Sequence, residues 1–503
     1  MNPQMGALRH IVLSDLHLGA LNSVLTNVGH GGGKVDTATA APVLTSLGAC
    51  LRALPAGADP PELVVLGDLF ELALTPLDDA AATFGHFVRA IGLGERDGAV
   101  APHVRFVAGN HDHQLWTRAR LDREIAVVAA TPTDHPLPDA AHVTSMFPDA
   151  DDVAARGRFI EALVRRAGVD AEVTVTHSYP NLAIRGEGDR VVVMHHGHFV
   201  ERLYRIMSSL DDIFDGPQAS HTVVDLESDN AGWIDFFWSS EGDSGDAGVD
   251  VRMLYESLVS GRTLDAELDQ ISRLVGASRR PPLGTVLRWV VDRGLRWASG
   301  AIGRAERHHP GAALSPDADA GLETYLAGPV AHELRRAFET PLPDTTFVFG
   351  HTHKPFVGTR GIAGYARPIA VVNTGGWVVD HPEAEPLKGA SVVLVDDEAN
   401  VVSVQLYRQR SDGAADPPAV VPADAHSIAF AEQVRSAIDA TRDPWARFTT
   451  DVVATLADRR RELQHREVAV RRRLRRAETK RASGLEQPRS IGAAIRLARG
   501  SDS

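Results

Sequence analysis

The sequence predicts an α/β fold that carries a helical insertion and a helical C-terminal extension. Short apolar stretches typical of buried strands alternate with segments of helical periodicity in residues 8–200 and again in residues 344–408. The residues between these two parts, and those beyond residue 424, show helical patterns without this alternation. Polar motifs rich in Asp, Asn and His follow directly after several predicted strands. Because such sheets bind ligands at the carboxyl ends of their strands, we expect the functional site there.

Composition limits the class of protein. The chain has 503 residues, 44% hydrophobic and 23% charged, which is ordinary for a globular protein with more than one domain. The single cysteine, Cys50, excludes disulfides and multi-thiolate metal sites within one chain. The first predicted strand begins at Leu8 and leaves no room for a signal peptide, and no apolar run could span a bilayer. We therefore expect a cytoplasmic protein, with peripheral membrane association as an alternative.

Short, nearly continuous apolar runs predict the first strands, at 8–13, 63–66 and 104–107. Helical patterns at 41–54 and 80–91 separate them. Residues 21–35 include Gly29, Gly31, Gly32 and Gly33 and predict a mobile loop over the site. A phosphate cradle is the weaker alternative, because no Gly-Lys-Ser/Thr sequence follows the glycines.

The remaining elements complete a discontinuous core. Residues 122–166 predict an irregular helical stretch, 172–176 a strand, and 182–185 with 190–194 a hairpin. Strands are expected again at 345–349 and 369–372, with 391–395 and 401–406 as edge strands. The predicted units are a core of 1–199 and 344–411, an insertion of 200–343 with helices at 200–213, 249–259, 263–275, 285–301 and 320–338, a linker of 412–424, and an extension of 425–503 with helices at 428–441 and 444–480.

Ligand-type residues follow five of these strands. Asp15 and His17 are two positions apart, so in extended backbone their side chains point the same way. Carboxylate, amide and imidazole donors without sulfur suit Mn, Fe or catalytic Zn. One such motif would be weak evidence, but five recur in one chain. In order they are Asp15 and His17; Asp68; Asn110, His111 and Asp112; His195, His196 and His198; and His351 and His353.

With the motifs D-L-H at 15–17, G-D at 67–68, G-N-H-D at 109–112, H-H-G-H at 195–198 and G-H-T-H at 350–353, the chain resembles the calcineurin-like metallophosphoesterases. That family carries these motifs in this order on a two-layer β-sandwich flanked by helices. The resemblance covers roughly residues 8–200 and 344–408. It implies a phosphoric ester hydrolase with two divalent metal ions and a metal-bridging hydroxide as nucleophile.

The resemblance also implies a role for each residue. Asp68 would bridge the two ions, His111 would stabilise or protonate the leaving oxygen, and Asp112 would orient His111. His196 is expected as the ligand in preference to His195, because the family has a single histidine before the glycine. The implied ligands are Asp15, His17 and His353 for one metal, and Asn110, His196 and His351 for the other.

The nearest branch resembles the bacterial UDP-2,3-diacylglucosamine hydrolases, through G-D-L-F-E at 67–71, H-K-P at 353–355 and N-T-G-G-W at 373–377. These enzymes cleave a pyrophosphate in a lipid-linked sugar nucleotide. The branch has Arg where this chain has His111, and this chain is longer. The resemblance therefore supports the type of reaction more strongly than the substrate. The expected substrate is a phosphorylated small molecule or a lipid-linked phosphate.

Three features leave alternatives open. The tail from Asp458 to Arg499 holds 14 Lys/Arg and 5 Asp/Glu, although the whole chain carries −14. It could bind an anionic membrane surface or nucleic acid, as in a nuclease of the same superfamily, or pair with the acidic body. Trp233, Phe236, Phe237 and Trp238 predict either a local core or a substrate wall, and Trp289 with Trp297 predict a packed or a lipid-contacting helix. A non-catalytic scaffold is the remaining alternative.

Overall fold

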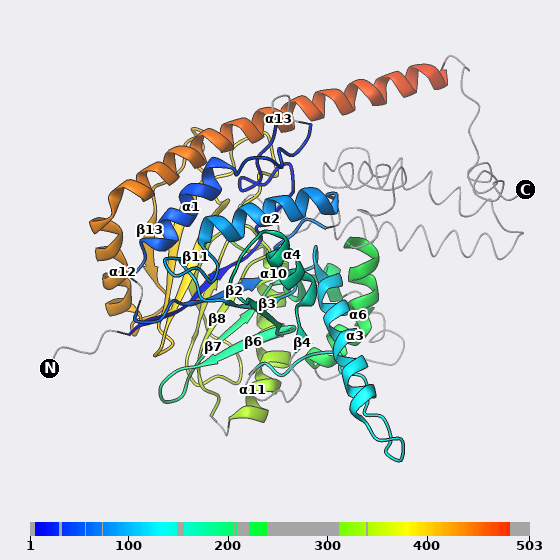
Figure 1. Ribbon diagram of the computed structural model, residues 1–503, viewed down its shortest axis with the longest axis vertical. Helices are drawn as coiled ribbons and strands as arrows, with labels where there is room; N and C mark the ends of the chain where they lie inside the picture. Colours follow the sequence, from blue (N-terminus) through cyan, green and yellow to red (C-terminus); the bar gives the residue numbers. More distant parts are fainter. Residues whose placement is uncertain are drawn as a thin grey trace, which may run out of the picture.

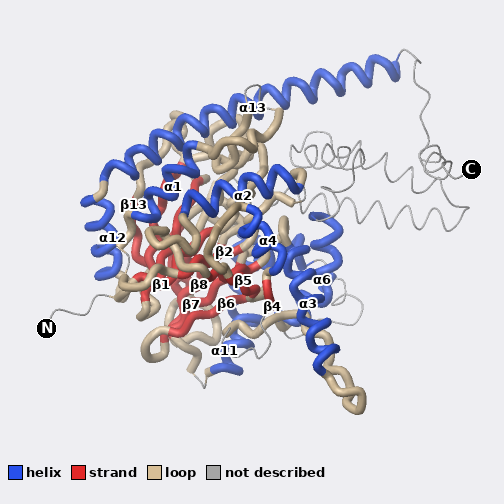
Figure 2. Tube along the Cα trace, in the orientation of Figure 1, coloured by secondary structure: helices blue, strands red, loops and turns tan. Residues whose placement is uncertain are grey.

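The computed structural model of the protein describes residues 6–29, 33–55, 57–72, 74–147, 155–205, 207–208, 221–238, 311–338 and 341–482. Their strands form two sheets, which lie in the middle of the molecule with helices around them (Figure 2). The predicted α/β class is therefore confirmed. The predicted helices at 249–259, 263–275 and 285–301, together with Trp289 and Trp297, lie outside the described residues.

The larger sheet has eight strands, and β1 lies in its interior. Parallel pairing joins β1, β2, β3 and β5, whereas β11 runs antiparallel to β1 on its other side. Strands buried on both faces are near-continuous apolar runs, which is why the sequence identified the first three. In sheet order the strands are β13 (Ala419–Pro422), β12 (Val401–Arg408), β11 (Gly389–Asp396), β1 (Leu8–Leu13), β2 (Glu62–Leu66), β3 (His103–Val107), β5 (Thr174–His177) and β4 (Ala155–Arg156).

The smaller sheet has five strands and draws on both halves of the sequence. The predicted hairpin forms from β6 and β7, and β7, β8 and β10 pair in parallel. In sheet order the strands are β6 (Asn181–Arg185), β7 (Arg190–His195), β8 (Asp344–Phe349), β10 (Ile369–Asn373) and β9 (Phe356–Arg360).

The two sheets pack face to face. One hydrophobic cluster contains Val12 and Val64 of the larger sheet together with Val192, Val348 and Val372 of the smaller sheet, all at most 1% exposed. Burying this much apolar surface between the layers fixes the sheets against each other. The loops at the strand ends of both sheets can therefore meet at a common edge.

Helices α1 (Pro42–Arg52), α2 (Leu77–Ile91) and α13 (Arg442–Ala482) cover the outer side of the larger sheet (Figure 1). Helix α13 packs on α1 and places Phe448 and Val452 in the same core cluster as Ile11 of β1. The short helix α12 (Ile428–Ala440) precedes it. The start of the predicted extension is thus part of the core, while the far end of α13 runs beyond the body (Figure 1).

The described part of the insertion covers the smaller sheet. It contains the 3-10 turns η2 (His198–Val200) and η3 (Arg202–Arg205), then α6 (Val223–Trp238), α10 (Pro316–Tyr325), η5 (Leu326–Val330) and α11 (Ala331–Ala337). The helix predicted at 320–338 is therefore formed by α10, η5 and α11 in direct succession. Its middle turn, η5, is π-helical and contains Pro329, which has no backbone N–H to donate. The predicted helix at 200–213 is wrong over 200–205, where 3-10 turns form.

Several boundaries differ from the predictions. The strands predicted at 391–395 and 401–406 are interior strands, because β13, within the predicted linker, pairs with β12 and forms that edge. Helix α3 (His113–Ala130) begins well before residue 122, and α4 (Arg158–Arg166) follows β4. Val24 and Leu25 are fully buried, so this part of the predicted mobile loop packs into the core.

In the described ranges, no helix is long and apolar enough to cross a membrane.

Candidate metal centre

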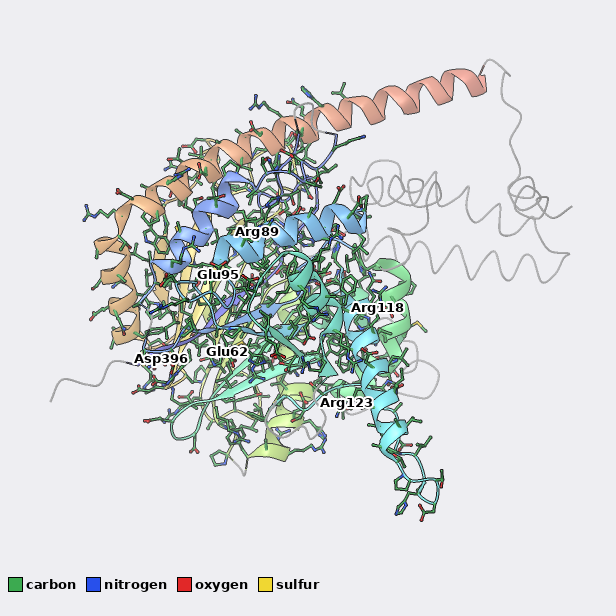
Figure 3. All side chains as sticks on the ribbon, in the orientation of Figure 1. Glu62, Arg89, Glu95, Arg118, Arg123 and Asp396 are labelled. Atoms are coloured by element: carbon green, nitrogen blue, oxygen red, sulfur yellow. The ribbon has the colours of Figure 1, made fainter. Side chains whose placement is uncertain are left out.

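The ligand-type residues meet at one edge of the sandwich, at the carboxyl ends of β1, β2, β3, β7 and β8. Backbone hydrogen bonds join their loops: the His17 N–H donates to Asp68 O at 2.9 Å, and the Gly350 N–H donates to His196 O at 2.7 Å. At the amino-terminal ends of β1 and β2, Asp396 pairs with Leu8 and Glu62 begins β2, and Figure 3 labels Glu62 and Asp396 near one another. Parallel strands therefore bring together motifs that lie far apart in the sequence.

The first group contains Asp15, His17 and His353, all buried. One donor atom from each lies within 4.8 Å of the other two. The Nε2 atom of His353 is 3.3 Å from Asp15 Oδ1. An oxygen and two imidazole nitrogens at these separations could hold one metal ion.

The second group contains Asp68, His196 and His351, with Asn110 beside it. The Nε2 atom of His196 lies 3.5 Å from Asp68 Oδ2, 3.1 Å from Asn110 Oδ1 and 3.2 Å from His351 Nδ1. The structure therefore brings together all four residues that the resemblance assigns to the second ion. His195 lies outside this group and packs near Phe199 and Tyr325.

Asp68 lies between the two groups. Its Oδ2 atom is 3.5 Å from His17 Nε2 and also 3.5 Å from His196 Nε2. Asp68 also forms a third possible metal-holding group with His17 and His111. One carboxylate is thus shared by two clusters of nitrogen donors, as expected for a bridging ligand.

The backbone at these residues is strained. Asp15, His17, Asp68, His351 and His353 have φ values of 51°, 44°, 50°, 69° and 59°, and of the described residues other than glycine only Ala399 shares this sign. Each such conformation costs on the order of 1–3 kcal/mol in a residue other than glycine and persists only where the surroundings impose it. The strain is therefore concentrated at the candidate ligands.

Two glycines make room for the carboxylates. A Cβ atom on Gly109 would overlap Asp68 Oδ1, and one on Gly350 would overlap Asp15 Oδ2. Any larger residue at either position would displace a candidate ligand, so the glycines of the G-N-H-D and G-H-T-H motifs are required by close approach.

The second ring nitrogen of each clustered histidine faces an oxygen acceptor. Such contacts fix the tautomer of a metal-binding imidazole and leave the opposite nitrogen for the ion. The donor set therefore fits divalent metal ions. The contacts are His17 Nδ1 to Glu71 Oε2 at 3.0 Å, His196 Nδ1 to Leu66 O at 2.8 Å, His351 Nε2 to Glu201 Oε1 at 3.2 Å and His353 Nδ1 to Asp380 Oδ2 at 3.5 Å.

Glu71 joins the candidate metal centre to His111. Its Oε1 atom lies 2.8 Å from His111 Nδ1, while Oε2 contacts His17. Burial works against its ionisation, but His111 and His17 hold the pKa of this carboxyl well below its usual range. Glu71 is the last residue of the G-D-L-F-E motif, and it was not among the predicted site residues.

Asp112 is predicted to orient His111, and the structure shows its carboxylate bonded to the backbone of two loops. The Asp112 carboxylate accepts backbone N–H groups from Gly109 and Leu69, each at 2.8 Å. These bonds tie the loop after β3 to the loop after β2. The carboxylate on the His111 ring belongs to Glu71 instead, so Asp112 holds the loops that position Asp68.

Trp238, at the end of α6, lies against the His111 ring with centroids 4.0 Å apart. Trp233 is partly buried in the cluster under the insertion and donates to Leu203 O at 3.0 Å. Of the aromatic residues in this segment, Trp233 is therefore part of a local hydrophobic core, and Trp238 lines the candidate site next to His111. The side chains of Phe236 and Phe237 lie outside the described structure.

Helix α6 is held in place by a buried ionic contact with His113. The two ring nitrogens of His113 lie 2.8 Å from Asp235 Oδ1 and 3.2 Å from Glu227 Oε1. Tyr179 donates to the other oxygen of Glu227 at 3.0 Å, and its hydroxyl also lies 3.3 Å from Nε2 of His198. His198 therefore joins this contact network, and its ring centroid also lies 5.5 Å from that of His196.

Replacing His113 with glutamine is expected to flatten the pH dependence of stability. Burial opposes its protonation, but Glu227 and Asp235 raise the pKa of His113 from 6.5 to about 10. The stabilisation is complete below the unfolded pKa of 6.5 and is lost as pH rises towards about 10. Denaturant unfolding of both proteins should show a difference that shrinks along this interval, and a difference independent of pH would contradict the assignment.

Parts of the predicted basic stripe on the tail are buried. Arg459 and Arg460 are 5% and 9% exposed, whereas Arg461 is exposed. The first two are thus unavailable to bind the phosphate groups of a membrane or a nucleic acid.

Compared with models of protein families and with curated protein sequences, the chain gives no match.

Proposed function

We propose that the protein is a two-metal phosphoric ester hydrolase of the calcineurin-like type, acting on a phosphate ester or pyrophosphate. One observation carries the proposal: seven ligand-type side chains form two groups that share Asp68. The strained backbone at five of them supports it, since strain of this kind clusters at functional sites.

Asp15, His17 and His353 would hold one ion, Asn110, His196 and His351 the other, and Asp68 both. Two divalent ions, of Mn, Fe or Zn, would supply a water of lowered pKa and neutralise the charge of the phosphoryl group. The absence of cysteine from the donor set favours these metals over a structural thiolate site.

The chain supplies the proton chemistry through His111. One ring nitrogen of His111 faces Glu71, so the opposite nitrogen would donate a proton to the leaving oxygen. The Glu71 carboxylate stabilises the protonated ring and fixes its orientation. Trp238 covers one face of His111 and limits the access of water to that side.

The substrate is proposed to be a phosphorylated small molecule or a lipid-linked phosphate. The test is hydrolysis by the purified chain of a phosphomonoester, a phosphodiester, a cyclic nucleotide and a UDP-sugar pyrophosphate, each with Mn, Zn or Fe. The preferred ester would identify the branch of the superfamily.

Metal removal is expected to abolish hydrolysis, and restoring about two ions per chain should recover it. Activity and bound metal would be measured on the same samples after chelation and during titration, with circular dichroism as the control for folding. Activity that survives complete chelation would contradict the proposal. A chain that binds no metal and hydrolyses nothing would favour the non-catalytic scaffold.

A further inference from the structure

The Asp15–His17 loop is connected to the C-terminal helix through a buried arginine. Arg459 of α13 donates from Nε to Ser23 O at 3.2 Å and from Nη2 to Thr26 O. Ser23 and Thr26 are fully buried, and Arg459 is 5% exposed. A buried guanidinium that binds two carbonyls restrains both, because leaving its N–H groups unpaired would be costly.

The segment that Arg459 holds is bonded directly to the ligand loop. The Ser23 hydroxyl donates to Leu16 O at 2.9 Å, and Leu16 lies between the two candidate ligands. The Ala20 N–H donates to His17 O at 3.0 Å, and the Gly19 N–H donates to Thr26 Oγ1 at 3.0 Å. Ser23 alone therefore links Arg459 to the carbonyl of Leu16, the residue before His17.

This connection is one of the contacts that maintain the strained backbone. His17 has a φ of 44° and Asp15 a φ of 51°, and such conformations persist only where the surroundings impose them. The 20–26 segment is also fixed from the other side, where the Val24 N–H donates to Trp377 O at 2.8 Å. Helix α13 adds a further contact to these and to the bond from the His17 N–H to Asp68 O.

We propose that Arg459 is a positioning residue for the metal site formed by Asp15, His17 and His353, and that the C-terminal helix is needed for full metal affinity there. This inference rests on the proposed function in one respect, that the site binds metal. It gives the start of the basic tail a role in the body of the enzyme, separate from any partner of the tail's exposed end.

Arg460 provides a matched control. It is the next residue on α13, is 9% exposed and also binds protein oxygens, donating to Gly413 O at 3.1 Å and to Gln409 Oε1 at 2.7 Å. These partners lie away from the ligand loop. Arg459→Ala and Arg460→Ala therefore both remove a buried cation from the same helix turn, but only the first should affect the metal site.

The experiment measures metal binding to the full-length chain by equilibrium dialysis against Mn²⁺ and Zn²⁺. Wild type and Arg460→Ala are expected to bind two ions with similar affinity. Arg459→Ala should keep one tight ion and bind the other about 10-fold more weakly or worse, as when an outer contact of a metal ligand is lost. Arg459→Lys should have an intermediate metal affinity, because the lysine ammonium lacks the planar set of N–H donors with which a guanidinium binds two carbonyls. Equal affinities in Arg459→Ala and Arg460→Ala would overturn the inference.

Two further measurements keep the outcome decisive. If Arg459→Ala does not fold, Ser23→Ala removes the bond from the Ser23 hydroxyl to Leu16 O and the bond that this hydroxyl accepts from the Leu25 N–H. This variant should weaken one ion selectively, and unchanged binding would overturn the inference. Amide hydrogen exchange at residues 17–24 of the metal-free proteins should be faster in Arg459→Ala than in Arg460→Ala. If the wild-type chain binds no metal, the proposed function fails, and the exchange measurement still decides whether Arg459 holds the loop.

Discussion

Replacing Asp68 with asparagine is expected to lower metal-dependent hydrolysis by at least about 10³-fold, more than the loss of a single transition-state donor. Asp68 Oδ2 lies 3.5 Å from a nitrogen of each group, so the substitution removes a charge shared by both candidate ions. Asparagine tolerates the positive φ of 50° and can keep the bond from the His111 N–H, which is 2.9 Å long. Alanine would remove that bond and add strain.

The measurement is initial-rate kinetics with added Mn²⁺, alongside metal content and thermal unfolding. Asp344→Asn is the matched control, because Asp344 begins β8, the strand whose other end leads to His351, and forms an ion pair with the exposed Arg367. The control should retain its activity within about twofold, since exposed ion pairs contribute little. An Asp68→Asn variant that keeps a tenth of the activity would exclude Asp68 as a bridging ligand.

Replacing Glu71 with glutamine is expected to impair metal binding and proton transfer together. Each oxygen of the carboxylate accepts from a different imidazole, His17 and His111. Glutamine has a single oxygen acceptor, so it can serve only one of the two rings. We expect metal affinity to fall about 10–100-fold and saturated-metal activity on an alkyl phosphate to fall about 10²-fold.

The leaving group separates the two effects. A nitrophenyl ester needs little protonation of its leaving oxygen, so with saturating metal Glu71→Gln should hydrolyse it far better, relative to wild type, than an alkyl ester. Glu201→Gln is the matched control, since Glu201 contacts His351 at 3.2 Å. It should weaken metal binding and affect both esters equally. Equal losses on both esters in Glu71→Gln would remove His111 from the proton-transfer role.

The strands that carry the candidate ligands could be predicted because each is an apolar run ending in polar residues. Strands β9 and β13 could not, since both are short edge strands with one paired neighbour. Strand β9 has mixed composition, and β13 lies in a stretch rich in Ala, Pro and Asp that is typical of a linker. The strand at 391–395 was predicted at a sheet edge because it is among the last strands of the core in the sequence. The prediction was wrong because β11 pairs with β1. Its uninterrupted run of Val and Leu was the available sign that both faces are buried.

The candidate ligands were predictable by motif, but their supporting contacts were not. Glu71 had a usable signal, since it is an acidic residue three positions after Asp68 in a motif that follows a buried strand. Glu201 and Asp380 had none, because their contacts with His351 and His353 depend on how the insertion and the loop after β10 pack. The burial of Arg459 could not be predicted, because the basic composition of the tail suggested that its arginines are exposed.

The pairing of β1 with β11 has a consequence for synthesis of the chain. Until Gly389–Asp396 leaves the ribosome, one side of β1 is an open strand edge, and His351 and His353 are made only shortly before. Such long-range pairing slows folding, and open edges are sites of aggregation. The nascent chain is therefore expected to depend on protection from chaperones until most of it has been translated.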